Sequence, residues 1–171
     1  MKTRMALEAG DVKTALAAAE AEAKANGWFN VSIAVVDDGA HLLGFIRLGD
    51  STPLNARICI EKARTAARSR RDSGYFEEMI KNGRHAYLSV PDLTALEGAV
   101  PVIVNGVCIG AIGVSGVKSD QDAQIARAGA QAIIGGADNA GKEPTRSLGR
   151  SVRGMRDRGR IVVPSLERHV R

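Results

Sequence analysis

The stretch "LEGAVPVIVNGVCIGAIGVSG", Leu96–Gly116, decides the fold, because it has the composition of a membrane span, a phosphate-binding loop or two buried strands. Asn105-Gly106 separates two apolar runs, and this dipeptide between such runs is a strong signal for a tight hairpin turn. The runs are too short and too interrupted for a membrane helix. Gly110 and Gly113 match neither G-x-G-x-x-G nor the Walker pattern. The stretch therefore predicts two buried strands, whose glycines mark the close approach of a helix, a ligand or another subunit.

The rest of the chain predicts helices around these strands. Helical periodicity, caps and stop signals favour helices at 11–25, from Pro53, at 73–81 and from Ser119 to Gly135-Gly136. Ser119 is expected to cap the last helix, with Asp122 completing a capping box. Further strands are predicted at 31–36, at 41–48 and near 86–90. The expected fold is α/β, a three-layer α/β/α sandwich with a mainly antiparallel five-stranded sheet.

Charge divides the chain into two parts. The net charge of the whole 171-residue chain is +5, yet residues 141–171 carry nine Lys or Arg and three Asp or Glu. We therefore expect a folded domain over residues 1–137 and a basic, disordered tail over 138–171. Because the basic charge belongs to the tail, nucleic acid is not an expected partner of the domain. No signal peptide or membrane span is predicted, so we expect a cytoplasmic protein.

The helix from Pro53 carries two sets of candidate side chains. Glu61 is spaced to pair with Arg64 on a charged face. Lys62 lies instead on a stripe with the small residues Cys59 and Ala66, where it either extends outward to solvent or points into a cavity. The histidines and cysteines show no metal-ligand spacing, so no metal site is predicted.

Several motifs together resemble the GlcG/HbpS family, which also supplies the C-terminal domain of PduO-type proteins. They are "SIAVVDDGAHLLGFIRLGD", "EKARTAARSRR", "FEEMIKNGR" and "LEGAVPVIVNGVCIGAIGVSGVKSDQDAQIARAG", and the resemblance runs over residues 2–134. It implies a profilin-like sandwich assembled into dimers or larger oligomers. It also implies several activities, since some members bind haem, some sense redox state, and one is thought to act as a 4-hydroxylaminobenzoate lyase that releases ammonia.

The first functional hypothesis is an enzyme that acts on a small organic acid, possibly aromatic, by a lyase reaction without a required cofactor. Such a site needs a cation for the substrate carboxylate and a group that transfers a proton. The predicted catalytic residues are Glu97, Lys62 and Glu61. The predicted substrate-binding residues are Arg47, Arg64, Thr65, Asp37 and Gly98.

Two other hypotheses stay open at this point. A haem- or tetrapyrrole-binding protein needs an axial ligand, for which His41 and His85 are the candidates, and basic residues would hold the propionates. A non-catalytic accessory protein, for example of a glycolate-utilisation operon, needs only the fold and the oligomer. In the enzyme reading, the expected partners are a small carboxylate and further copies of the chain.

Overall fold

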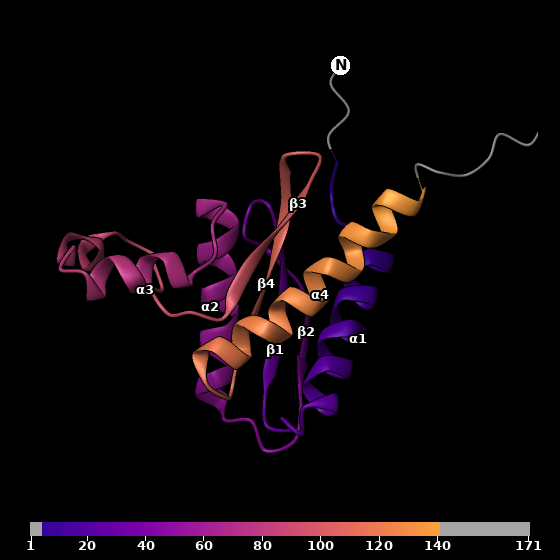
Figure 1. The fold of residues 1–171 in the computed structure, drawn as a ribbon, viewed down its shortest axis with the longest axis horizontal. Coiled ribbons are helices and arrows are strands. Elements are labelled where there is room, and N and C mark those ends of the chain that lie inside the picture. The colour runs from indigo at the N-terminus through magenta and orange to yellow at the C-terminus, as the bar shows by residue number, and fades with distance from the viewer. Residues whose placement is uncertain (1–4, 141–171) are drawn as a thin grey trace, which may run out of the picture.

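The computed structural model describes residues 5–140. Of the predicted tail, 138–171, residues 138–140 belong to the last helix and residues 141–171 lie outside the described residues. The chain folds as a helix, a hairpin, two helices with a short 3-10 turn, a second hairpin and a final helix (Figure 1). The helices are α1 (Ala9–Ala25), α2 (Pro53–Ser69), α3 (Gly74–Lys81), η1 (His85–Ser89) and α4 (Ser119–Ala140). The strands are β1 (Ser32–Asp37), β2 (Leu42–Arg47), β3 (Ala99–Val104) and β4 (Val107–Ser115).

Among the described residues the sheet has four strands in the order β2-β1-β4-β3, and every neighbouring pair is antiparallel. Both predicted hairpins are confirmed, with Asn105 and Gly106 in the left-handed conformation that a tight turn requires. The fifth strand, predicted near residues 86–90, is wrong. That segment forms η1, where Tyr87 packs on Phe76 of α3 with ring centroids 5.4 Å apart. Contact with α3 thus replaces strand pairing.

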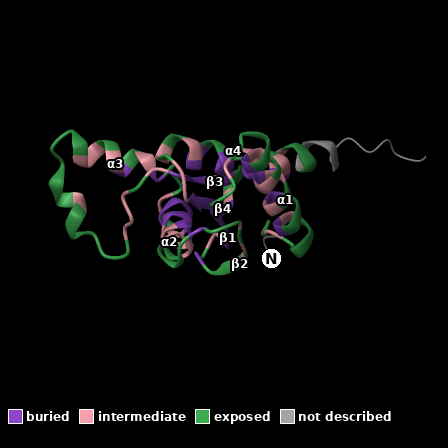
Figure 2. Cartoon of the chain, turned by 90° about the horizontal axis from the view of Figure 1, so that it is seen from below, coloured by how far each residue is buried: buried purple, intermediate pink, exposed green. Residues whose placement is uncertain are grey.

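Helices cover both faces of the sheet. On one face α1 and α4 pack over Ile33, Val35 and Ile112, and this cluster forms the larger part of the core. On the other face α2 packs over Val36 and Ala111 in a second cluster built mainly from alanine. Figure 2 shows the buried residues concentrated between these layers. Successive residues of β1 and β4 point to opposite faces of the sheet, and both faces are buried because helices cover each of them.

The surroundings of Gly113 show what approaches the glycine-bearing strands closely. A methyl group at this position would overlap the carbonyl oxygen of Cys59 and would lie 2.7 Å from the amide nitrogen of Ala63. Both atoms belong to the backbone of α2. The glycine therefore allows α2 to lie directly on β4, so that the close approach is that of a packed helix.

The last helix differs from its prediction at both ends. It continues through Gly135 and Gly136 to Ala140, so the expected stop is wrong. Glycine lowers helix stability by only about 1 kcal/mol and does not end a helix by itself. The helix already includes Ser119, and Lys118 donates its N–H to Gln121, so Asp122 does not complete the expected capping box.

The α3–η1 arm, residues 74–89, projects away from the three layers (Figure 1). Phe76 is the one buried residue within α3, and η1 has none. Among residues 5–140, no helix combines the length and the apolar character needed to cross a membrane.

Candidate functional site

The turn between β1 and β2 brings a histidine against a carboxylate. The Nδ1 atom of His41 lies 3.1 Å from Oδ2 of Asp37, and the backbone N–H of His41 donates to Oδ1 of the same carboxylate over 2.8 Å. A methyl group on Gly39 would lie 2.9 Å from the imidazole, so the ring folds back over this glycine. The turn thus fixes both the position and the orientation of the imidazole.

The charge of the Asp37 carboxylate determines which ring nitrogen of His41 carries the proton. Partial burial raises the pKa of the Asp37 carboxyl, but hydrogen bonds from the His41 backbone and ring lower it by more, so its pKa lies below the ordinary 3.8. An ionised carboxylate only accepts hydrogen bonds, so Nδ1 of His41 carries the proton. In the neutral ring Nε2 then holds a free lone pair, on a side chain that is 80% exposed.

Arginine and glutamate side chains from α2 complete this surface. Arg64 donates from Nε to the carbonyl oxygen of Ala40 in the same turn, over 3.3 Å. Its guanidinium also pairs with Glu61 at 2.7 Å, as the spacing predicted. We call Asp37, His41, Glu61 and Arg64 the His41 cluster. It combines one metal-ligating nitrogen with one cation and two carboxylates.

Lys62 lies in the interior, and its ammonium is engaged there. Nζ lies 2.9 Å from Oδ2 of Asp122 and 3.1 Å from the carbonyl oxygen of Val114. The two charged side chains are only 4% and 3% exposed. Gly98, at φ +128°, makes this possible, because a methyl group there would lie 2.6 Å from Nζ. Lys62 therefore points into the interior but meets a carboxylate rather than open space.

Burial has the largest effect on the pKa of Asp122 in this pair. Removal of the Asp122 carboxyl from solvent raises its pKa, while the neighbouring Lys62 charge and hydrogen bonds act to lower it, and the net direction is upward. Sequence reasoning assigned Asp122 to a helix cap and missed this contact. A signal for it exists, since Asp122 lies on the same stripe of α4 as the buried Ala126, four residues further on.

The remaining predicted residues lie in other places. Glu97 packs its side chain against Gly74 of α3 and donates its backbone N–H to Glu77, and no hydrogen bond or ion pair joins it to Lys62 among the described residues. Thr65 is buried and accepts from the backbone of Thr94 over 2.9 Å. Arg47 is exposed at the far end of β2, roughly 20 Å along the strand from His41.

Surface hollows do not gather the predicted catalytic residues. Among the hollows of the described part of the chain are ones of 430–450 Å³, and Glu97, Lys62 and Glu61 do not line them. The structure thus divides the predicted site into the His41 cluster, the interior pair around Lys62, the contact of Glu97 with α3, and Arg47 at the opposite sheet end.

Comparison with known proteins decides the family. Residues 7–131 match the family model described as "Haem degrading protein HbpS-like". The chain belongs to the GlcG/HbpS family. Protein GlcG of Escherichia coli K12 is 51% identical to it over 115 residues, which cover 67% of this chain and 85% of GlcG. The family predicted from the motifs is confirmed.

Solved structures of GlcG/HbpS relatives share the fold. A double mutant of HbpS from Streptomyces reticuli aligns with a TM-score of 0.69 at 28% identity, covering 77% of this chain and 89% of that one. A PduOC–haem complex aligns with a TM-score of 0.67 at 22% identity, covering 75% and 95%. The second similarity is one of fold alone.

Proposed function

We propose that this chain binds haem at the His41 cluster, where Nε2 of His41 would ligate the iron. The observation that carries the proposal is the Asp37–His41 hydrogen bond. Histidines that ligate metals usually donate their other ring N–H to a carboxylate or carbonyl, which fixes the tautomer and makes the ligand nitrogen more basic. His41 has this arrangement, and its Nε2 belongs to an exposed side chain.

The other residues of the cluster fit the same group. Haem supplies a redox-active iron and two anionic propionates. Arg64 is held beside the turn by the Ala40 carbonyl, and a guanidinium binds carboxylates with two parallel hydrogen bonds. In this arrangement Asp37 orients the imidazole and Glu61 positions Arg64, which would hold a propionate. The family description as haem degrading and the PduOC–haem complex of a relative with the same fold support the proposal.

His41 is favoured over His85 as the ligand. His85 begins η1 on the projecting arm, whereas His41 follows a tight turn and pairs with a carboxylate. The two histidines are both exposed, so they provide a matched pair of variants.

Titration of the full chain with haemin tests the proposal. The wild type should give a sharp Soret band, His41→Ala should weaken haemin binding at least tenfold, and His85→Ala should bind like the wild type. Gly39→Ala, which displaces the ring without removing it, should also weaken binding. Free-haemin absorbance with the wild type, or equal binding by the wild type and His41→Ala, would overturn the proposal.

A lyase reaction on 4-hydroxylaminobenzoate at Lys62 and Glu97 stays a prediction with less support. The Lys62 ammonium is paired with Asp122, and the Glu97 side chain packs on α3. None of the relatives described above carries a name that points to such a reaction. Ammonia release from that substrate, abolished by Glu97→Gln, would restore it as the leading function.

A further inference from the structure

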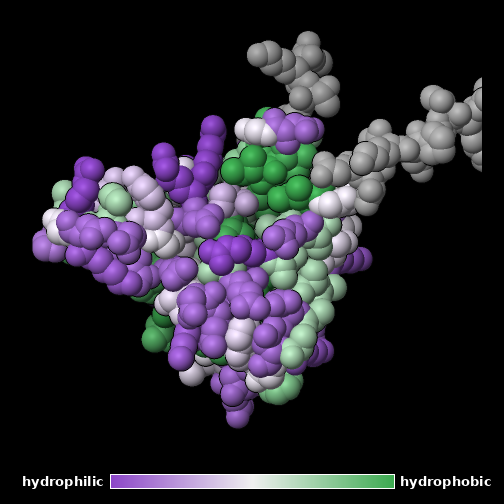
Figure 3. All heavy atoms as spheres, viewed as in Figure 1, coloured by the Kyte–Doolittle hydropathy of each residue, from purple (hydrophilic) through white to green (hydrophobic). Residues whose placement is uncertain are grey.

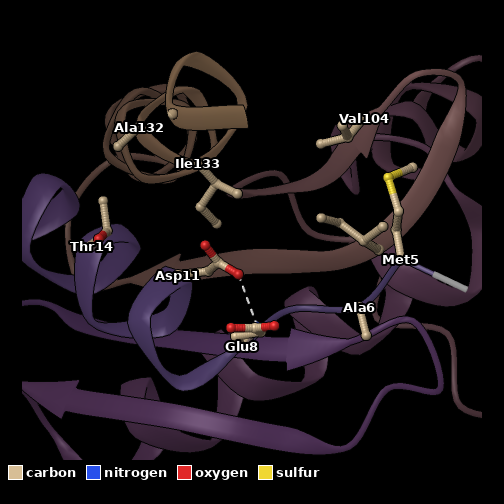
Figure 4. A pocket seen from close by; sticks show the side chains of 10 residues that line it. Met5, Ala6, Glu8, Asp11, Thr14, Val104, Ala132 and Ile133 are labelled. Atoms are coloured by element: carbon tan, nitrogen blue, oxygen red, sulfur yellow. Dashed lines mark hydrogen bonds between the residues drawn. The ribbon is translucent and has the colours of Figure 1, made fainter. Parts of the chain in front are cut away.

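A hollow of about 450 Å³ opens where the N-terminal segment, α1, the second hairpin and α4 meet (Figure 4). It lies on the α1–α4 side of the sheet, whereas the His41 cluster is joined to α2 on the other side, and the proposed function does not use it. Apolar side chains form most of its wall. They include Met5, Val104, Ile109 and Ile133.

The apolar wall is open to solvent mainly at Met5, which is 39% exposed, whereas Val104, Ile109 and Ile133 are only 5–7% exposed. Val107, which pairs with Val104 across the second hairpin, is 47% exposed. In Figure 3 strongly hydrophobic residues gather at this end of the molecule, between the points where the two grey chain ends leave it. An apolar patch of this kind on a globular chain marks an interaction surface.

The charge at the hollow has one sign. Glu8 and Asp11 are the charged residues among those that line it, and both are acidic. One oxygen of Asp11 accepts the backbone N–H of Glu8 over 2.8 Å, as Figure 4 shows. A carboxylate accepts several hydrogen bonds, so both groups retain capacity for a cationic partner. The hollow therefore suits a segment that is apolar and flanked by basic residues.

The tail of this chain contains such a segment. "RGRIVVPSL", residues 158–166, joins three consecutive β-branched apolar residues to two arginines. Helix α4 ends at Ala140, about one turn beyond Gly136, which itself lines the hollow. The 18 residues from 141 to 158 span up to roughly 60 Å when extended, which is ample for a return to the hollow.

We propose that residues 158–166 dock in this hollow of the same chain, with Ile161–Val163 on the apolar wall and Arg158 and Arg160 beside Glu8 and Asp11. The α4 part of the wall and the tail share a further property. Both lie beyond residue 131, where the family match ends. The tail and the α4 part of the wall therefore lie outside the family match, whereas Glu8, Asp11 and the hairpin part of the wall lie within it.

Paramagnetic relaxation in the full chain tests the docking. A nitroxide is attached at Ser165→Cys in a Cys108→Ser background, where the remaining Cys59 is buried. We expect the methyl signals of Ile133 and Ile109 to lose intensity several-fold relative to the reduced label. Ile80, on the projecting arm, should keep its intensity.

A matched pair of charge reversals separates docking from general attraction. Arg158→Glu with Arg160→Glu should restore most of the Ile133 signal. Arg146→Glu with Arg150→Glu changes the tail charge equally and should leave the loss in place. No signal loss, equal loss at Ile80 and Ile133, or equal effects of the two pairs would overturn the proposal. So would signal loss found only between a spin-labelled copy and a second, isotope-labelled copy, since the tail would then cover a neighbour.

Discussion

Cys59 shows how strongly burial changes the chemistry of a single side chain. It lies on α2 directly over β4 and is fully buried, whereas Cys108 is partly exposed. Burial raises the pKa of the Cys59 thiol to about 12, and interactions with the Ile60 backbone and the Lys62 charge lower it by less. The reactive form of cysteine is the thiolate, so Cys59 is inert at neutral pH.

Alkylation at pH 8 should therefore modify Cys108 and leave Cys59 intact until the chain unfolds, as mass spectrometry of the digested protein would show. The raised pKa of Cys59 also makes the stability of the fold depend on pH. The folded state keeps the thiol neutral, so this contribution to the free energy of unfolding is present below pH 9.0 and declines as the pH rises towards 12. Rapid alkylation of Cys59 in the native protein would contradict the burial.

At the scale of elements, the Lys62–Asp122 pair connects layers that lie on opposite faces of the sheet. Lys62 comes from α2 and Asp122 from the first turn of α4, and the contact passes beside Gly98. A buried ion pair of this kind adds little net stability compared with an apolar pair, but loss of one partner leaves an uncompensated charge.

Lys62→Met should therefore lower the free energy of unfolding by about 3–5 kcal/mol, measured by urea denaturation. Lys62→Met with Asp122→Leu should recover much of this loss, because no buried charge remains. Arg64→Met, which breaks the partly exposed pair with Glu61, should cost less than about 1 kcal/mol. A double variant as unstable as Lys62→Met would show that the pair's geometry, rather than charge balance, holds the layers.

The elements that sequence predicted best are those fixed by local chemistry. The Asn105-Gly106 turn and the Thr52 cap, whose hydroxyl accepts from Asn55, depend on residues within four positions of one another. The errors depend on distant contacts. Residues 86–90 have strand-like composition but pack on α3, and Gly135-Gly136 resembles a stop although the helix continues through it.

The candidate site divides in the same way. The Glu61–Arg64 pair follows from helical spacing and was predicted, whereas the partner of Lys62 is 60 positions away in the chain. The separation of Glu97 from Lys62 could not be predicted from the sequence either, because the Glu97 side chain packs against Gly74 of α3. His41 was a candidate only for the haem hypothesis, and its pairing with Asp37 depends on the exact shape of the turn.

At the scale of the whole molecule, the α3–η1 arm is the part that the three layers do not explain. It extends from the body with a mostly exposed surface, as Figure 2 shows. Leu88 of the arm is 71% exposed, and Val90, directly after the arm, is 46% exposed. Isolated apolar residues are ordinary on a surface, but neighbouring ones at a projecting segment indicate a protein contact. We therefore expect the arm to bury these residues against another copy of the chain.

Leu88→Asp with Val90→Asp should thus convert the oligomer to a monomer, measured by light scattering after size-exclusion chromatography. Two charges in an apolar interface would remain unpaired after assembly, which disfavours association strongly. Leu54→Asp is the control, because Leu54 is 64% exposed at the start of α2, away from the arm, and its variant should assemble like the wild type. A wild-type chain that is monomeric at all concentrations, or an arm variant with unchanged mass, would place the function of these side chains elsewhere.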